Sequence, residues 1–262
     1  MFWPVVRGRQ VAQVVALASI LACGSSGNVD NAKNSRETKD NTSIAETGST
    51  AASSTTGSGV TVGRSSGSAG APTVLFFGTS LTAGLGLEPE QAYPSLIEKK
   101  AKDEGVPIEV VNAGLSGETT AGAVRRIDWV LRAPADLIVI EAGANDALRG
   151  LPPDDARANL ETLIAAVKAK QPQAKIALIQ MEAPPNFGVA YTRAFHAIYP
   201  EVAKKENVTL LPFLLDGVAG ISRLNQPDGI HPNLTGERIV ADNVWKAVKP
   251  LVTQLDRGSK GG

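Results

Sequence analysis

Cysteine and histidine are scarce in this chain, and its charges cancel. The 262 residues include one cysteine, two histidines, 26 basic and 26 acidic residues. A single cysteine excludes an internal disulfide, so a folded domain must rely on its core. Zero net charge gives no electrostatic footprint of a nucleic-acid partner, and no apolar run reaches the ~20 residues of a membrane-spanning helix. Any site that depends on histidine must use His196 or His231.

The first 23 residues have the organisation of an export signal. Arg7 and Arg9 provide a positive start, and an apolar run follows over 11–22. The run ends at Cys23 in a Leu-Ala-Cys-Gly sequence that resembles the lipobox of bacterial lipoproteins. This resemblance implies lipidation of Cys23 and attachment of an exported protein to a membrane of the bacterial cell envelope, in the periplasm. An ordinary cleavable signal and an uncleaved anchor remain the alternatives.

Residues 24–72 are rich in serine, threonine and glycine and show no apolar periodicity. A segment with so little to bury does not form a core, so we predict a disordered tether with a root-mean-square reach of roughly 40 Å. We expect one folded domain over 73–256, which is long enough for a substantial core, and a flexible tail over 257–262.

Short apolar runs alternate with helical patterns through the predicted domain. The runs cover 74–77, 108–111, 137–140, 176–179 and 208–211, and the helical patterns cover 91–104, 119–132, 155–170, 188–206 and 234–255. Short apolar runs also fit buried helices, but their regular alternation favours strands. The order predicts an α/β fold with a mainly parallel sheet, helices on both faces and right-handed crossovers.

Ser80 follows the first of these runs, after Gly78 and Thr79. Crevices in open α/β sheets lie at the carboxyl ends of the strands, which is where a nucleophile would be useful. A serine after a strand is also commonly a turn residue or a helix cap. The functional interpretation therefore requires a base close to Ser80 in the fold, because a serine hydroxyl is a poor nucleophile without one.

His231 suits the role of base better than His196 does. His196 lies in an amphipathic helical pattern, where a single histidine is usually a surface or packing residue. His231 lies in a loop rich in glycine, proline and asparagine, and Asp228 stands three residues before it. A carboxylate so placed can accept the Nδ1–H and leave Nε2 facing the serine, although an Asp-Gly pair is also a common turn.

Two further strand ends carry candidate oxyanion donors. Gly117 can expose a backbone N–H because it has no Cβ, and Asn145 offers a neutral side-chain donor. Each also has a purely structural interpretation, Gly117 as a turn and Asn145-Asp146 as a helix cap.

Four sequence blocks together resemble the SGNH (GDSL-type) serine hydrolases. They are Gly-Thr-Ser-Leu at 78–81, Ser-Gly-Glu-Thr at 116–119, Gly-Ala-Asn-Asp at 143–146 and Asp-Gly-Ile-His-Pro-Asn at 228–233. The likeness extends over about 73–255 and is to the bacterial periplasmic branch of thioesterase I, lysophospholipase and arylesterase. It implies a flavodoxin-like three-layer α/β/α sandwich with a mainly parallel five-stranded sheet.

The resemblance also implies roles for the candidate residues. Ser80 would be the nucleophile, His231 the base and Asp228 its partner. The oxyanion hole would comprise the backbone N–H groups of Ser80 and Gly117 and the side chain of Asn145. The expected function is a serine esterase that cleaves small acyl esters, aryl esters, lysophospholipids or thioesters without a metal or organic cofactor.

Three qualifications accompany this expectation. A carbohydrate O-acetylesterase would use the same residues on a sugar ester, and a tethered binding module could share the fold without catalysis. Thr79 stands where the family pattern has aspartate. Threonine can hydrogen-bond the turn but brings no negative charge.

Overall fold

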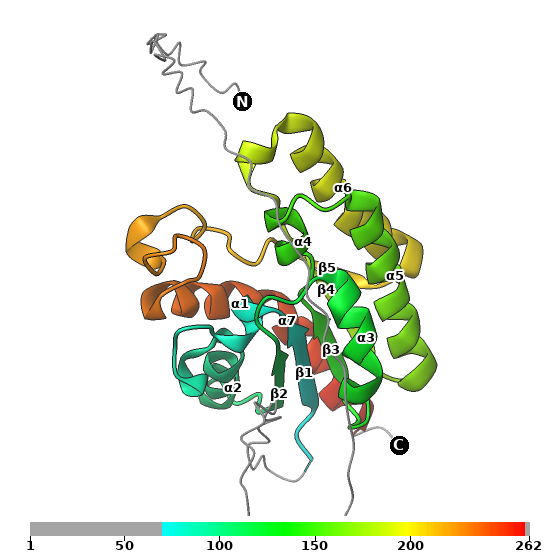
Figure 1. Ribbon diagram of the computed structural model, residues 1–262. Helices are drawn as coiled ribbons and strands as arrows, with labels where there is room; N and C mark the ends of the chain where they lie inside the picture. The colour runs from blue at the N-terminus through cyan, green and yellow to red at the C-terminus, as the bar shows by residue number, and fades with distance from the viewer. Residues whose placement is uncertain (1–69, 260–262) are drawn as a thin grey trace, which may run out of the picture. The chain divides into compact units, whose positions relative to one another are not determined.

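The computed structural model describes residues 70–259. The predicted export signal with Cys23 and the predicted tether up to residue 69 lie outside this range, as do residues 260–262. Five parallel strands form one sheet in the order β2-β1-β3-β4-β5 (Figure 1). They are β1 (Thr73–Gly78), β2 (Glu109–Gly114), β3 (Leu137–Ile140), β4 (Lys175–Ile179) and β5 (Thr209–Leu211).

Helices cover both faces of the sheet. They are α1 (Ser80–Ala83), α2 (Tyr93–Asp103), α3 (Thr120–Val130), α4 (Ala144–Leu148), α5 (Pro153–Lys170), α6 (Val189–Glu206) and α7 (Leu234–Ser259), with short 3₁₀ turns η1 (Pro89–Gln91), η2 (Pro185–Phe187) and η3 (Ser222–Leu224). The α2 and α7 helices pack together on one face, and α5 packs between α3 and α6 on the other (Figure 1). The predicted α/β/α sandwich is confirmed.

The core explains why the strands were readable from the sequence. Residues 74–77 of β1 and 137–140 of β3 are at most 2% exposed. Strands of a parallel sheet covered on both faces are buried on both sides, so they appear as continuous apolar runs rather than alternating patterns. Helix α5 instead buries one face, through Leu160, Leu163, Ile164 and Val167, which is the spacing of an amphipathic helix.

The topology places a crevice at the carboxyl end of β1. The chain leaves β1 along one face of the sheet to reach β2 and returns along the other face to reach β3. Ligands of open α/β sheets bind outside the strand ends at such a switch point, and Ser80 is at this position. Most element limits agree with the sequence prediction to within two residues, but the short helices α1 and α4 have no predicted counterpart, β2 extends to Gly114, and α7 runs to Ser259 rather than ending near 255.

Candidate active site

Ser80 begins α1 directly after the turn that ends β1. Thr79 is the extended residue before the helix, with φ −100° and ψ −152°. Ser80 is 7% exposed. A Cβ at Gly78 would collide with Thr82 Oγ1 and with Glu141 Oε2, so the turn requires glycine at that position. The local sequence therefore brings a nearly buried hydroxyl to the carboxyl edge of the sheet.

His231 connects Ser80 to Asp228 through both of its ring nitrogens. Its Nε2 lies 2.8 Å from Ser80 Oγ, and its Nδ1 lies 2.6 Å from Asp228 Oδ2. The other oxygen of Asp228, Oδ1, accepts hydrogen bonds from the backbone N–H groups of Ile230 and His231. The distances fit a serine whose proton passes to an imidazole that a carboxylate orients.

The loop of residues 225–233 holds this histidine in place. Gln226 Nε2 donates to the carbonyl oxygens of Leu85 and Pro232, at 2.7 and 3.0 Å. Leu85 follows the helix that begins with Ser80, so this side chain ties the histidine loop to the serine turn. Asn233 Oδ1 accepts two backbone N–H groups in the first turn of α7, which anchors the far end of the loop.

Asp228 is held in its ionised form. Burial by itself would raise its pKa, but the hydrogen bonds from the His231 side chain and from the Ile230 and His231 backbone outweigh burial and lower the pKa to about 2. The carboxylate is therefore charged across the neutral range and is available to orient a protonated imidazole.

Gly117 and Asn145 bring uncommitted donors to the same edge. Gly117 has φ +76°, a left-handed conformation that glycine adopts without strain. Its carbonyl accepts a hydrogen bond from Arg149 Nη2 at 2.9 Å. Neither the Gly117 N–H nor the Asn145 carboxamide bonds to another residue within 70–259. Donors left unpaired at a strand end are what a developing oxyanion needs.

Asp146 fixes the start of α4 against the start of α3. It is 2% exposed, and it accepts the Thr120 backbone N–H at 2.8 Å and the Thr120 hydroxyl at 2.6 Å. Thr120 Oγ1 in turn accepts Asn159 Nδ2 from α5. The loop that carries Gly117 and the helix that carries Asn145 are thereby tied to one buried carboxylate.

Glu141 lies beneath the serine turn, and we assigned it no role from the sequence. It is fully buried at the end of β3, and its Oε2 accepts the Thr79 N–H at 2.7 Å and the Thr82 hydroxyl at 2.9 Å. The Thr79 hydroxyl lies 3.0 Å from both carboxylate oxygens. The sequence signal that could have indicated a role for Glu141 is its position, because it is a charged residue directly after the apolar run 137–140.

His196 does not contact this group. It lies on α6 with its side chain 58% exposed, and its Nδ1 is 2.7 Å from Glu182 Oε1. Within residues 70–259, no cluster of three or more histidine, cysteine, aspartate or glutamate side chains has the arrangement of a metal site.

Comparisons with known proteins identify the family of this chain. The model of the GDSL-like Lipase/Acylhydrolase family matches residues 76–239. The chain belongs to this family. It is 42% identical to "Esterase TesA" of Pseudomonas aeruginosa over 70% of this chain and 91% of that one. It is 37% identical to "Thioesterase 1/protease 1/lysophospholipase L1" of Escherichia coli over 70% and 86%.

A solved structure extends the agreement to the fold. The psychrotrophic esterase EstA from Pseudoalteromonas sp., inhibited by monoethylphosphonate, is 33% identical, covers 70% of this chain and 99% of its own, and has a TM-score of 0.66. The family and the enzyme class expected from the sequence, a carboxylic ester hydrolase, are confirmed.

Proposed function

We propose that Ser80, His231 and Asp228 are the catalytic triad of a serine esterase that acts on small acyl esters and thioesters. The observation that carries this assignment is the continuous chain of contacts from Ser80 Oγ through His231 to Asp228, at 2.8 and 2.6 Å. We assign the oxyanion hole to the backbone N–H groups of Ser80 and Gly117 and the side chain of Asn145.

The reaction follows from this assignment in two similar halves. Ser80 Oγ bonds to the acyl carbon while His231 Nε2 takes its proton, and the carbonyl electrons move to the oxygen that the donors hold. The intermediate collapses, His231 protonates the departing alcohol or thiol, and an acyl-enzyme remains. Water then gives a proton to His231 and attacks the acyl carbon. Collapse returns that proton to Ser80 and releases the carboxylic acid.

Exposed apolar side chains around the strand ends support an apolar acyl group. Leu85, Leu115, Leu148 and Ile230 are 44%, 36%, 40% and 40% exposed. Leu85 follows the helix of Ser80, Leu148 ends the helix of Asn145, and Leu115 and Ile230 lie in the loops of Gly117 and His231. Large exposed apolar groups gathered at one edge mark binding surfaces. The names of the relatives, which include esterase, thioesterase and lysophospholipase, agree with such substrates.

We further propose that the protein is exported and attached to a membrane through lipid on Cys23. Support comes from the residues before the domain, which have the order of a signal followed by a lipobox-like cysteine. Within residues 70–259, no helix is both long enough and apolar enough to cross a membrane.

A fluorophosphonate probe tests the nucleophile. We expect the wild-type protein to be labelled and Ser80→Ala to be folded, unlabelled and without ester turnover. Labelling or full activity of Ser80→Ala would refute the assignment. A series of p-nitrophenyl esters and matched thioesters of increasing acyl length, run beside acetylated glycans, then separates an acyl esterase from a carbohydrate O-acetylesterase.

A further inference from the structure

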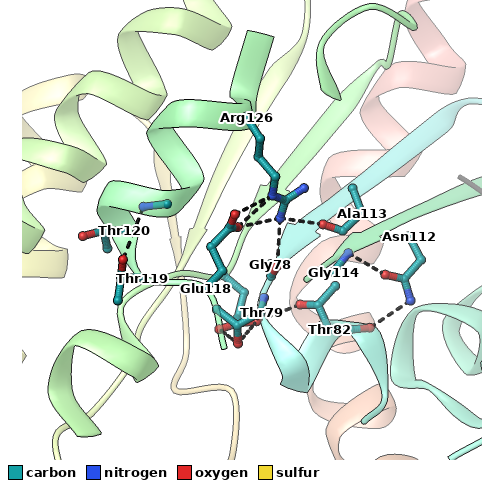
Figure 2. Close-up of polar contacts among 12 residues, drawn as sticks. Gly78, Thr79, Thr82, Asn112, Ala113, Gly114, Glu118, Thr119, Thr120 and Arg126 are labelled. Carbon is teal, nitrogen blue, oxygen red and sulfur yellow. Dashed lines mark hydrogen bonds and ion pairs between the residues drawn. The ribbon is translucent and has the colours of Figure 1, made fainter. Parts of the chain in front are cut away.

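Arg126 places a guanidinium behind the ends of β1 and β2. Its side chain extends from α3 and is 14% exposed. Nη2 donates to the carbonyl oxygens of Gly78 and Ala113, at 3.1 and 2.9 Å, and the guanidinium carbon lies 4.2 Å from the centre of the Phe77 ring. Figure 2 shows the side chain reaching both strand ends. Arg126 therefore contacts the residue that begins the serine turn.

The same guanidinium holds the residue after Gly117. Its Nε lies 2.7 and 2.8 Å from the two oxygens of Glu118, and its Nη2 lies 2.7 Å from one of them. The Glu118 side chain is 6% exposed. At the other end of this loop, Leu115 N–H donates to Gly78 O. The loop that carries Gly117 is thus tied at two points to the turn that carries the serine.

We propose that Arg126 and Glu118 are positioning residues, which hold the Gly117 N–H at a fixed distance from the Ser80 turn. This inference rests on the oxyanion role proposed above for Gly117. Oxyanion donors are effective only when they are held where the charge develops, and a misplacement of about 1 Å is enough to be costly.

The chemistry of the pair supports positioning over simple stabilisation. A planar guanidinium binds a carboxylate and carbonyl groups at fixed angles, whereas a lysine ammonium is a compact charge on a flexible stem. Arg126 Nη1 is buried and has no hydrogen-bond partner among the described residues. A buried donor left unpaired is costly, and the guanidinium keeps this orientation despite that cost, with Nε and Nη2 bonded to Glu118 and to the two strand ends. It is oriented by the two strand ends and the Gly117 loop.

Arg126→Lys tests the inference, with Arg125→Lys as its matched control. Arg125 is the preceding residue of the same helix; its side chain is exposed and makes no hydrogen bond or ion pair within residues 70–259. For Arg126→Lys we expect kcat on an aryl ester to fall roughly tenfold to a hundredfold, less than the 10²–10³ caused by losing a donor. KM should stay within about twofold, the pattern of an interaction made only in the transition state. Arg125→Lys should match wild type.

A tetrahedral inhibitor separates positioning from a structural role. An alkyl trifluoromethyl ketone forms an oxyanion on the serine, so its inhibition constant should rise in Arg126→Lys by the same factor as kcat/KM falls. A lower melting temperature with unchanged kcat and inhibition constant would overturn the inference. If Arg126→Lys fails to fold, Glu118→Gln, which keeps the shape and one acceptor oxygen, is measured instead and should show the same paired change. Normal kinetics in a folded Glu118→Gln would equally overturn it.

Two reference variants, Ser80→Ala and Asn145→Ala, show whether a negative result contradicts only the positioning role of Arg126 or the proposed function as well. If Ser80→Ala is inactive and Asn145→Ala is slow, but Arg126→Lys behaves like Arg125→Lys, only the positioning inference falls. If Ser80→Ala retains activity, the triad assignment falls and the positioning inference falls with it.

Discussion

Replacing Glu141 by alanine removes the acceptor beneath the serine turn. The carboxylate accepts the Thr79 N–H, the Thr79 hydroxyl and the Thr82 hydroxyl. Thr82 keeps a second partner, because its Oγ1 also lies 3.0 Å from Tyr93 Oη. Both Thr79 donors lose the only partner they have among residues 70–259. Thr79 is 2% exposed, so water reaches these donors poorly. Glu141→Ala should therefore destabilise the fold and disturb Ser80 together.

The magnitude follows from the two stranded donors. A buried donor without a partner costs about 1–3 kcal/mol, so Glu141→Ala should cost roughly 2–6 kcal/mol. In a domain of this size 1 kcal/mol corresponds to about 2–4 °C, which predicts a melting temperature lower by roughly 5–20 °C. Because the unpaired donors adjoin Ser80, the proposed nucleophile, kcat should fall even at temperatures where the variant is folded.

Glu141→Gln is the matched control, and it has its own pH signature. Burial raises the pKa of Glu141 to about 7, against the hydrogen bonds from Thr79 and Thr82 that lower it. The folded protein therefore holds this proton more tightly than the unfolded chain does. The resulting stabilisation is fully present below the unfolded pKa near 4.5 and is lost as pH rises through about 7. Glutamine cannot titrate, so Glu141→Gln lacks this decline.

Other buried groups near Glu141 do not obscure the test. Burial also raises the pKa of Glu237 to about 8, which adds a decline of the same sign, but Glu141→Gln retains it. The pKa of Tyr93 and that of Tyr199 are raised well above their usual value by burial and by the Glu141 charge, so neither group titrates between pH 5 and 8. The difference between the variant and wild type therefore isolates Glu141.

Urea denaturation at pH 5 and pH 8 measures this difference. Wild type should lose stability between pH 5 and pH 8 through Glu141, and Glu141→Gln should not. The free energy of unfolding of Glu141→Gln minus that of wild type should therefore be larger at pH 8 than at pH 5, by up to a few kcal/mol at about 1.4 kcal/mol per pKa unit. If the stability difference between Glu141→Gln and wild type did not change with pH, Glu141 would not bind a proton more tightly in the folded protein. If Glu141→Ala were as stable as wild type, the hydrogen bonds from Thr79 to Glu141 would not contribute the predicted stability.

Two further predictions concern the catalytic groups. Asn145→Ala should lower kcat by roughly 10²–10³ and leave the melting temperature nearly unchanged, because its carboxamide bonds to no other described residue; a loss of stability as large as that of Glu141→Ala would contradict a free donor. His231→Ala should abolish turnover and His196→Ala should leave it near wild type, as steady-state kinetics on an aryl ester would show. Equal losses in the two histidine variants would refute the choice of base.

The sequence predicted the sheet and nominated Ser80 and His231 as candidate site residues for physical reasons. Strands buried on both faces are continuous apolar runs, and the alternation with helices leaves few topologies. With two histidines in the chain, local context was enough to prefer His231 over His196 as the candidate base. Helix α4 escaped detection because its five residues are too few to establish a helical period.

Arg126 and Glu141 could not be assigned because their roles depend on distant residues. Arg126 lies in an amphipathic helix, where an arginine is normally solvated. Its partners Gly78 and Ala113 are 48 and 13 residues away. Glu141 bonds to Thr79 across 62 residues. The pairing of the strands brings Arg126 and Glu141 to these partners, and no local sequence pattern reveals which residues the strand pairing will place together.

Thr79 acquires a physical explanation once its partner is known. The sequence suggested that threonine in place of aspartate deprives the turn of a negative charge. The structure places a carboxyl group there from β3, since Glu141 accepts both Thr79 donors, and its pKa of about 7 leaves it only partly charged near neutral pH. An aspartate at 79 would put two carboxyl groups into one buried network, where like charges force one of them to keep its proton. Threonine supplies a donor instead, so the turn residue and the carboxylate beneath it must be considered as a pair.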